Sequence, residues 1–86
     1  MAELRKAAGE WLKGLREARG LSQTELAERV GVDYYSFISQ IENGRGRIPS
    51  ARYAKWADAL GLPRREFVRN ILKYYDPTVY DLLFED

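Results

Sequence analysis

The 86-residue chain has neither cysteine nor histidine, and it has no long apolar run. Without cysteine there are no disulfide bonds or thiolates, and without either residue the usual zinc ligands are missing. A membrane-spanning helix needs about 20 predominantly apolar residues in a row, and the sequence has no such stretch. The N-terminal residues, which include Glu3, Arg5 and Lys6, do not resemble a secretory signal. We therefore expect a cytoplasmic protein without membrane contact, metal or other cofactor.

The sequence also lacks the usual elements of an active site. It offers no histidine or cysteine, no phosphate-binding glycine loop after a strand, and no carboxylate pair outside mixed-charge helix surfaces. The segment Gly44-Arg45-Gly46 is too short for more than a turn. Hydrophobic residues make up 45% of the chain, which is typical of one small globular domain. We do not expect an enzyme.

Charge is distributed unevenly along the chain. The net charge is +1, but residues 76–86 carry four acidic side chains and no basic one, so residues 1–75 hold 14 basic and 9 acidic side chains. A basic body with an acidic tail suits a surface that faces phosphate and a segment kept away from it. An ordinary mixed-charge surface explains most individual lysines and arginines equally well. Charge alone therefore supports a nucleic-acid partner without identifying one.

Apolar residues recur every three or four positions through most of the chain, which predicts helices and no strands. The first helix, over residues 1–19, carries the stripe Leu4, Ala8, Trp11, Leu12, Leu15 and Ala18. Gly9 and Gly14 each weaken it by about 0.5–1 kcal/mol relative to alanine, so we expect the residues before Gly9 to fray. Further helices are predicted from about Ser50, after Pro63, and over residues 78–84.

The middle of the chain has the pattern of two short helices joined by a tight turn. Ser22 is a good N-cap, and Glu25 completes a capping box with it. Gly31 stands where the first helix must end, because a residue without Cβ adopts the left-handed conformation easily. Asp33 is placed to cap the second helix, which we expect over residues 34–42. This is the pattern of a helix-turn-helix.

Two segments, Leu15–Val32 and Ile41–Gly44, resemble the phage repressor/Cro-type (XRE) helix-turn-helix family at nearly the family's spacing. The resemblance extends from about Leu12 to Phe67 and places the motif at residues 22–43. It implies an all-α, compact five-helix repressor-like domain over residues 1–73, with a helical or irregular C-terminal extension. The resemblance implies a transcriptional regulator that binds double-stranded DNA sequence-specifically, most simply a dimeric repressor on an inverted-repeat operator.

In this family the second motif helix enters the major groove, which is about 12 Å wide. The resemblance implies that helix 34–42 meets base edges through Tyr35, Ser36, Ser39 and Gln40. Glutamine can pair bidentately with adenine. An ordinary solvated helix face is the alternative for Gln40 and the two serines. The chain has one residue more than the family between Gly31 and Gly44, so Tyr34 or Tyr35 could instead be wedged into the core.

Contacts to DNA phosphates are implied for six residues: Gln23, Tyr34, Asn43, Arg45, Arg47 and Arg52. Gln23 begins the first motif helix, whose terminal N–H groups favour an anion. In this family a glutamine here anchors a phosphate and braces the second helix. Arg45 and Arg47 lie in a glycine-containing loop that, in the family, runs beside the DNA backbone. A solvent-exposed basic loop is the alternative.

A structural ion pair is implied between Arg16 and Glu42. In the family, an arginine of the first helix pairs beneath the motif with the glutamate of Ile-Glu-Asn-Gly, here Ile41–Gly44. The resemblance gives this pair a structural role and no catalytic one. Removal of either partner from a buried pair leaves the other charge stranded, which costs about 3–5 kcal/mol.

The extension, residues 74–86, has more aromatic and apolar residues than a five-helix domain of this size needs: Tyr74, Tyr75, Tyr80, Leu82, Leu83 and Phe84. Exposed patches of this kind mark interfaces, and family members bind two half-sites as symmetric dimers. We therefore assign these residues to a homodimer interface. Two alternatives remain open. The segment could cover its own fourth and fifth helices, or it could bind a regulatory protein partner such as a toxin, with DNA binding secondary.

Overall fold

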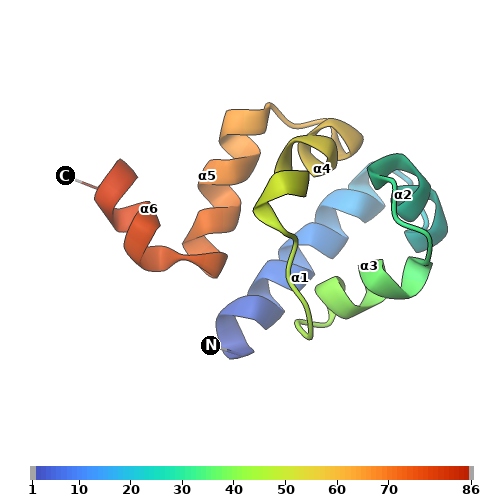
Figure 1. Cartoon of the computed structure of the whole chain (residues 1–86), viewed down its shortest axis with the longest axis horizontal. Helices are drawn as coiled ribbons and strands as arrows, with labels where there is room; N and C mark the ends of the chain where they lie inside the picture. Colours follow the sequence, from blue (N-terminus) through green and yellow to red (C-terminus); the bar gives the residue numbers. More distant parts are fainter. Residues whose placement is uncertain (1, 86) are drawn as a thin grey trace.

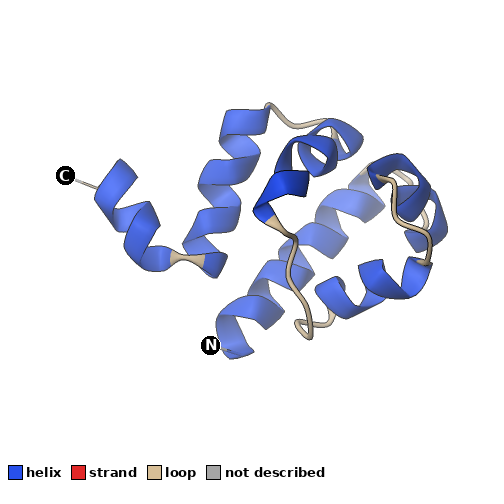
Figure 2. Cartoon of the chain, in the orientation of Figure 1, coloured by secondary structure: helices blue, strands red, loops and turns tan. Residues whose placement is uncertain are grey.

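The computed structural model describes residues 2–85, which form six α-helices and one short 3-10 helix (Figures 1 and 2). In chain order the elements are α1 (Ala2–Ala18), α2 (Gln23–Val30), α3 (Tyr35–Glu42), the 3-10 helix η1 (Ser50–Arg52), α4 (Tyr53–Leu60), α5 (Arg64–Tyr75) and α6 (Pro77–Phe84). These residues include no strand, which confirms the all-α prediction. A membrane-spanning helix is likewise absent from this range.

α1 is continuous from Ala2, so the residues before Gly9 are helical and the structure does not reproduce the expected frayed start. Gly9 is buried where α1 packs against α3. A Cβ added to Gly9 would lie 2.6 Å from the carbonyl carbon of Glu42 and 2.7 Å from the carbonyl oxygen of Ile41. The missing side chain therefore lets the two backbones meet. In the predicted apolar stripe, Ala8 and Leu12 are buried and Trp11 and Leu15 pack against the core, whereas Leu4 is half-buried and Ala18 is exposed.

The capping box predicted for α2 is present. Ser22 Oγ accepts the Glu25 N–H at 3.0 Å, and Glu25 Oε1 accepts the Ser22 N–H at 2.9 Å. Gly31 ends α2 with a φ of 77°, as expected. The prediction that Asp33 caps the next helix is wrong. Tyr34 occupies the N-cap of α3, and no side chain within the described residues caps this terminus.

The hydrophobic core joins the first five α-helices. α1 packs against α3 and α5, and α4 packs against α2 and α5. The largest fully buried side chains are Leu12, Leu26, Val30, Ile38, Ile41, Ile48, Trp56, Phe67 and Ile71. Each of the helices α1 to α5 contributes to this set, and Ile48 contributes from the loop before η1. The orientation of the helix-turn-helix is therefore fixed from beneath by side chains drawn from the whole domain.

α5 runs through Tyr74 and Tyr75, so these residues belong to the fifth helix and pack against the core. Asp76 then caps α6: its Oδ1 accepts the Val79 N–H at 3.2 Å, and Pro77 occupies the first turn. The predicted helical extension is thus a two-turn helix. α6 packs against α5. It lies at the end of the molecule opposite α2 and α3 (Figure 1).

Candidate nucleic-acid interface

α3 has a polar outer face and an apolar inner face. Ile38 and Ile41 point into the core and are fully buried. The outer residues are Tyr35, Ser36 and Gln40, which are exposed, and Ser39, which is half-buried. The four residues predicted to meet base edges therefore lie together on one side of a single short helix. Hydrogen-bonding groups on such a face are available to the edges of bases in a groove.

Both tyrosines at the start of α3 point away from the core. Tyr34 is 73% exposed and Tyr35 is 59% exposed. The alternative in which one of them is wedged into the core is therefore wrong. α2 ends at Val30 and α3 begins at Tyr35, and Ile38 and Ile41 are fully buried on the inner side of α3.

Three side chains connect α1, α2 and α3 beneath this face. Arg16 Nε donates to Glu42 Oε2 at 2.7 Å, and Arg16 Nη2 donates to Glu42 Oε1 at 3.0 Å. Gln23 Nε2 also donates to Glu42 Oε1, at 3.1 Å. Arg16 Nη1 donates to the Leu21 carbonyl at 2.7 Å. The predicted ion pair is thus present, and its side chains are only 9% and 3% exposed. The hydrogen bonds to Glu42 raise the pKa of Arg16 further above its ordinary value.

The loop over residues 44–49 is held at both ends. At its start, Gly44 has a φ of 78°, and a Cβ there would lie 2.8 Å from the Cα of Lys6 on α1. Two successive loop amides donate to the Gln40 carbonyl at 2.9 and 3.3 Å. Near its other end, the Ile48 side chain is fully buried. The loop backbone therefore has a defined course despite its glycines.

The predicted phosphate contacts Arg45 and Arg47 extend from this loop into solvent. Asn43, at the end of α3, is also exposed, and its Nδ2 lies 3.5 Å from Ser39 Oγ. Gln23 lies at the start of α2. The structure therefore places positive charge directly after the exposed helix.

Tyr75 contacts this loop, which the sequence did not predict. The Ile48 N–H donates to the Tyr75 hydroxyl at 3.1 Å, and the guanidinium carbon of Arg47 lies 4.6 Å from the centre of the Tyr75 ring. Burial raises the pKa of the Tyr75 phenol above its ordinary value of 10.0. The sequence predicts Tyr75 at a dimer interface. Its ring and hydroxyl are instead engaged within its own chain.

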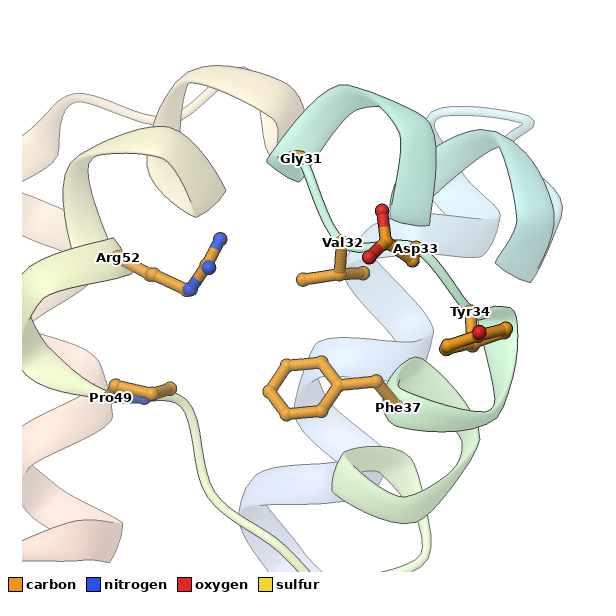
Figure 3. Close-up of a pocket in the computed structure, with 7 residues that line it drawn as sticks. All are labelled: Gly31, Val32, Asp33, Tyr34, Phe37, Pro49 and Arg52. Carbon is orange, nitrogen blue, oxygen red and sulfur yellow. The ribbon is translucent and has the colours of Figure 1, made fainter.

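Arg52 lies behind the loop, beside a pocket of about 350 Å³ between the start of α3 and η1 (Figure 3). Arg52 Nη1 donates to the Val30 carbonyl at 3.1 Å. The last carbonyls of a helix lack partners within that helix, so this bond stabilises the end of α2. Val32, Phe37 and Pro49 form the apolar walls of the pocket (Figure 3).

The remaining residues of the predicted dimer interface are two exposed leucines and three half-buried aromatic residues. Leu82 and Leu83 are 79% and 64% exposed. Tyr80 and Phe84 are half-buried, pack on each other with ring centres 5.3 Å apart, and lie beneath cationic side chains of α5. Tyr74 packs beside Trp11, with ring centres 5.8 Å apart. α6 therefore contacts α5 but leaves its two leucines outside.

In this small helical domain, a capped helix, a tight turn and a second helix lie on a shared core, and the second helix has an exposed polar face. This arrangement defines the helix-turn-helix class. Residues 7–69 match the family model described as a helix-turn-helix domain, and the chain belongs to this family. This confirms the resemblance inferred from the sequence. A search of curated protein sequences found no significant match.

Solved structures of regulators share the fold. The restriction-modification controller protein C.AhdI from Aeromonas hydrophila is 37% identical, with a TM-score of 0.66, over 78% of this chain and 98% of that chain. One structure of the clp gene regulator ClgR from C. glutamicum is 30% identical, with a TM-score of 0.67, over 83% of this chain and 90% of that chain. A second ClgR structure from Corynebacterium glutamicum, 24% identical with a TM-score of 0.66 over 96% of both chains, supports the fold alone. The family and these neighbours support a DNA-binding transcriptional regulator.

Proposed function

We propose that this chain is a sequence-specific repressor that binds double-stranded DNA as a homodimer, with α3 in the major groove. The observation that carries this proposal is the exposed polar face of α3, formed by Tyr35, Ser36, Ser39 and Gln40 above a fully buried inner face. Gln40 is suited to bidentate pairing with adenine. Bound at an operator in cytoplasmic DNA, such a dimer represses by occupancy.

Phosphate contacts on both sides of α3 would orient the domain on the duplex. On one side, Gln23 lies at the start of α2, where helix N–H groups favour an anion. On the other side, Arg45 and Arg47 extend from a loop whose course is fixed. The remaining candidates are Tyr34, Asn43 and Arg52. Arg52 is half-buried behind the loop and already donates to the Val30 carbonyl, so we give it the weakest of these contacts.

We assign dimerisation to α6 and the adjoining surface of α5. A groove of about 450 Å³ is lined by Arg64, Arg65, Val68, Leu83 and Phe84. Its basic rim and apolar floor complement a second copy of α6, a mostly apolar helix that carries Asp81, is followed by Glu85 and contains no basic residue. An isologous contact of this kind closes a two-fold dimer.

This location of the interface also suits the binding of two half-sites. α6 and the α2–α3 pair lie at opposite ends of the long axis of the molecule (Figure 1). A two-fold axis at α6 would therefore place the two α3 helices on the outer flanks of the dimer. Helix-turn-helix dimers need this separation, since their half-sites are one helical turn of DNA apart. The names of the neighbours, a controller protein and a gene regulator, also favour a regulatory role.

The experiment that tests this function is selection of binding sites from random duplex DNA at near-physiological salt, followed by measurement of the mass of the bound complex. We expect enrichment of an inverted repeat bound by two chains. Binding should weaken with salt, and each of Arg45→Ala and Arg47→Ala should reduce the slope of log K against log salt by about 0.9 per subunit, or about 1.8 for the dimer.

Binding that shows no sequence preference would contradict the proposal. The exposed leucines of α6 would then favour the second candidate, a protein-interaction module or antitoxin that holds a partner through this helix. The two functions respond differently to substitution. DNA binding depends on Gln40, Arg45 and Arg47 and is strongly salt-dependent, whereas apolar contact through Leu82 and Leu83 is much less so.

A further inference from the structure

We propose that Tyr75 is a positioning residue for binding of the DNA backbone. Tyr75 holds the loop over residues 44–49 and orients Arg47 towards a phosphate. The proposal rests on the DNA-binding function above and names a residue outside the helix-turn-helix on which that function depends. Tyr75 is in the last turn of α5 and is separated from the loop by more than 25 residues of chain. It nevertheless contacts two successive loop residues, one through its hydroxyl and one through its ring.

The hydroxyl of Tyr75 fixes the loop backbone. Ile48 lies outside the helices, so its N–H takes part in no helical hydrogen bond, and it donates to Tyr75 Oη at 3.1 Å. Because the Ile48 side chain is fully buried, an unpaired amide at this position would be costly. This bond therefore holds the loop near its C-terminal end, while Gly44 seated against Lys6 holds it at its start.

The ring of Tyr75 orients the Arg47 side chain. The guanidinium carbon of Arg47 lies over the ring, 4.6 Å from its centre, within the range of a cation–π contact. A guanidinium that stacks through its face keeps its N–H donors available, because these donors lie in its plane. Arg47 remains solvent-exposed. The contact therefore restricts the side chain without consuming the groups that bind a phosphate.

This restriction should increase affinity. An arginine that is ordered only when it meets DNA loses rotamer freedom at that moment, whereas one already held over a ring loses less. Arg45, on the same loop, has no such aromatic support among the described residues, so the two arginines differ in their degree of preorganisation. Tyr75 would thus act on DNA affinity through Arg47 and make no contact with DNA.

The first test needs no DNA. Amide hydrogen exchange at Ile48 is measured in the wild-type chain, in Tyr75→Phe, which removes only the hydroxyl, and in Tyr74→Phe, a matched control in the same helix turn. We expect faster exchange at Ile48 in Tyr75→Phe alone. Unchanged exchange at Ile48 in Tyr75→Phe would overturn the assignment of this bond.

The second test uses a short random-sequence duplex, because phosphate contacts do not depend on sequence. Affinity is measured for Tyr75→Leu and Arg47→Ala, singly and together, after thermal unfolding shows that each variant is folded. We expect Tyr75→Leu to weaken binding by about fivefold when Arg47 is present and by less than about twofold when it is already alanine. A merely structural role would give the same loss in both backgrounds and would overturn the proposal.

The design separates failure of this inference from failure of the proposed function. If the wild-type chain binds no duplex at all, the DNA-binding function fails and the phosphate role of Tyr75 fails with it, whereas the exchange measurement still reports the bond to Ile48. If the wild-type chain binds DNA and the two substitutions act additively, only the inference about Tyr75 is lost. Should Tyr75→Leu unfold the domain, Tyr75→Met, which also removes the ring, takes its place in the same comparison.

Discussion

The buried carboxylate of Glu42 shows how much one residue contributes to the candidate nucleic-acid interface. It accepts hydrogen bonds from Arg16 and Gln23, and thereby ties α3 to both α1 and α2. The pair is nearly inaccessible to solvent, so its partners are stabilised by each other and not by water. The position of α3 relative to α2 therefore depends on a charge that does not itself reach the surface.

We predict that Glu42→Ala destabilises the domain by about 3–5 kcal/mol, because it leaves the Arg16 guanidinium buried without its counter-ion. Thermal unfolding should show a melting temperature lower by at least about 10 °C. Asp58→Ala is the matched control, because it breaks the exposed pair with Arg64, whose side chains are 55% and 66% accessible, and should change melting little. Equal melting of Glu42→Ala and wild type would contradict the structural role of the pair.

The phenol of Tyr75 gives a prediction about pH. Its pKa is raised in the folded chain by burial, so above pH 10.0 the unfolded chain loses this proton first. The folded state then holds more protons than the unfolded state, and stability falls as pH rises. Denaturant midpoints at about pH 9 and about pH 11 should therefore fall less for Tyr75→Phe than for wild type. Identical falls in the two chains would show that Tyr75 contributes nothing to the alkaline loss.

At the scale of single residues, the sequence predicts those contacts that depend on neighbouring residues or that the family shares at the same position. Ser22, Glu25 and Gly31 adopt the predicted caps because capping involves residues only a few positions apart. The contact of Tyr75 with Ile48 could not be predicted in the same way. It joins residues far apart in sequence, and nothing in the local pattern distinguishes Tyr75 from Tyr74.

At the scale of elements, the two glycines of α1 have different roles that helix propensity does not separate. Gly9 faces the backbone of α3 at a distance too short for any side chain. Gly14 is exposed, and within the described residues nothing lies within 4 Å of a Cβ added there. Propensity treats both as weak points of the helix. Packing makes the first of them necessary.

We predict opposite effects for alanine at these two positions. Gly14→Ala should stabilise the domain by about 0.5–1 kcal/mol through helix propensity. Gly9→Ala should destabilise it by more than that gain, because α1 must move away from α3 to admit the methyl group. Chemical denaturation of both variants measures the difference. A stabilising Gly9→Ala would contradict the close contact between the two helices.

α3 also shows which features of a helix can be predicted from its sequence. The inward positions of Ile38 and Ile41 follow from the helical period, and their exposed neighbours follow with them. The start of the helix did not follow, since Asp33 looked like a cap and Tyr34 took that place. An additional turn residue can be absorbed in several ways, and only the packing of the whole motif selects one.

At the scale of the whole molecule, the proposed DNA-reading surface and the proposed dimer surface occupy opposite ends of a body that measures 39 × 26 × 22 Å. The helical class and the helix-turn-helix family could be predicted from periodicity and motif spacing. The division of the C-terminal aromatic and aliphatic residues between the core and the surface could not be predicted. Tyr74 and Tyr75 joined the core, whereas Leu82 and Leu83 stayed outside, and this depends on how α6 leaves α5.

We predict that Leu83→Asp abolishes self-association. The substitution replaces an exposed apolar side chain that lines the groove with a charge that would have to be buried in the interface. Sedimentation over a range of concentrations should show a monomer. Thr78→Asp adds the same charge to an exposed position of the same helix and should leave the dimer intact. Dimers that persist in Leu83→Asp would rule out this surface.

We propose that α3 recognises bases, and the most direct test is the affinity of wild type and Gln40→Ala for a selected operator and its single-base variants. We predict that Gln40→Ala loses about 1–3 kcal/mol of discrimination at one base position of each half-site and keeps its preferences elsewhere. A uniform loss across all sequences would show that Gln40 only supports backbone binding. No loss at any position would contradict the account of α3 as the reading helix.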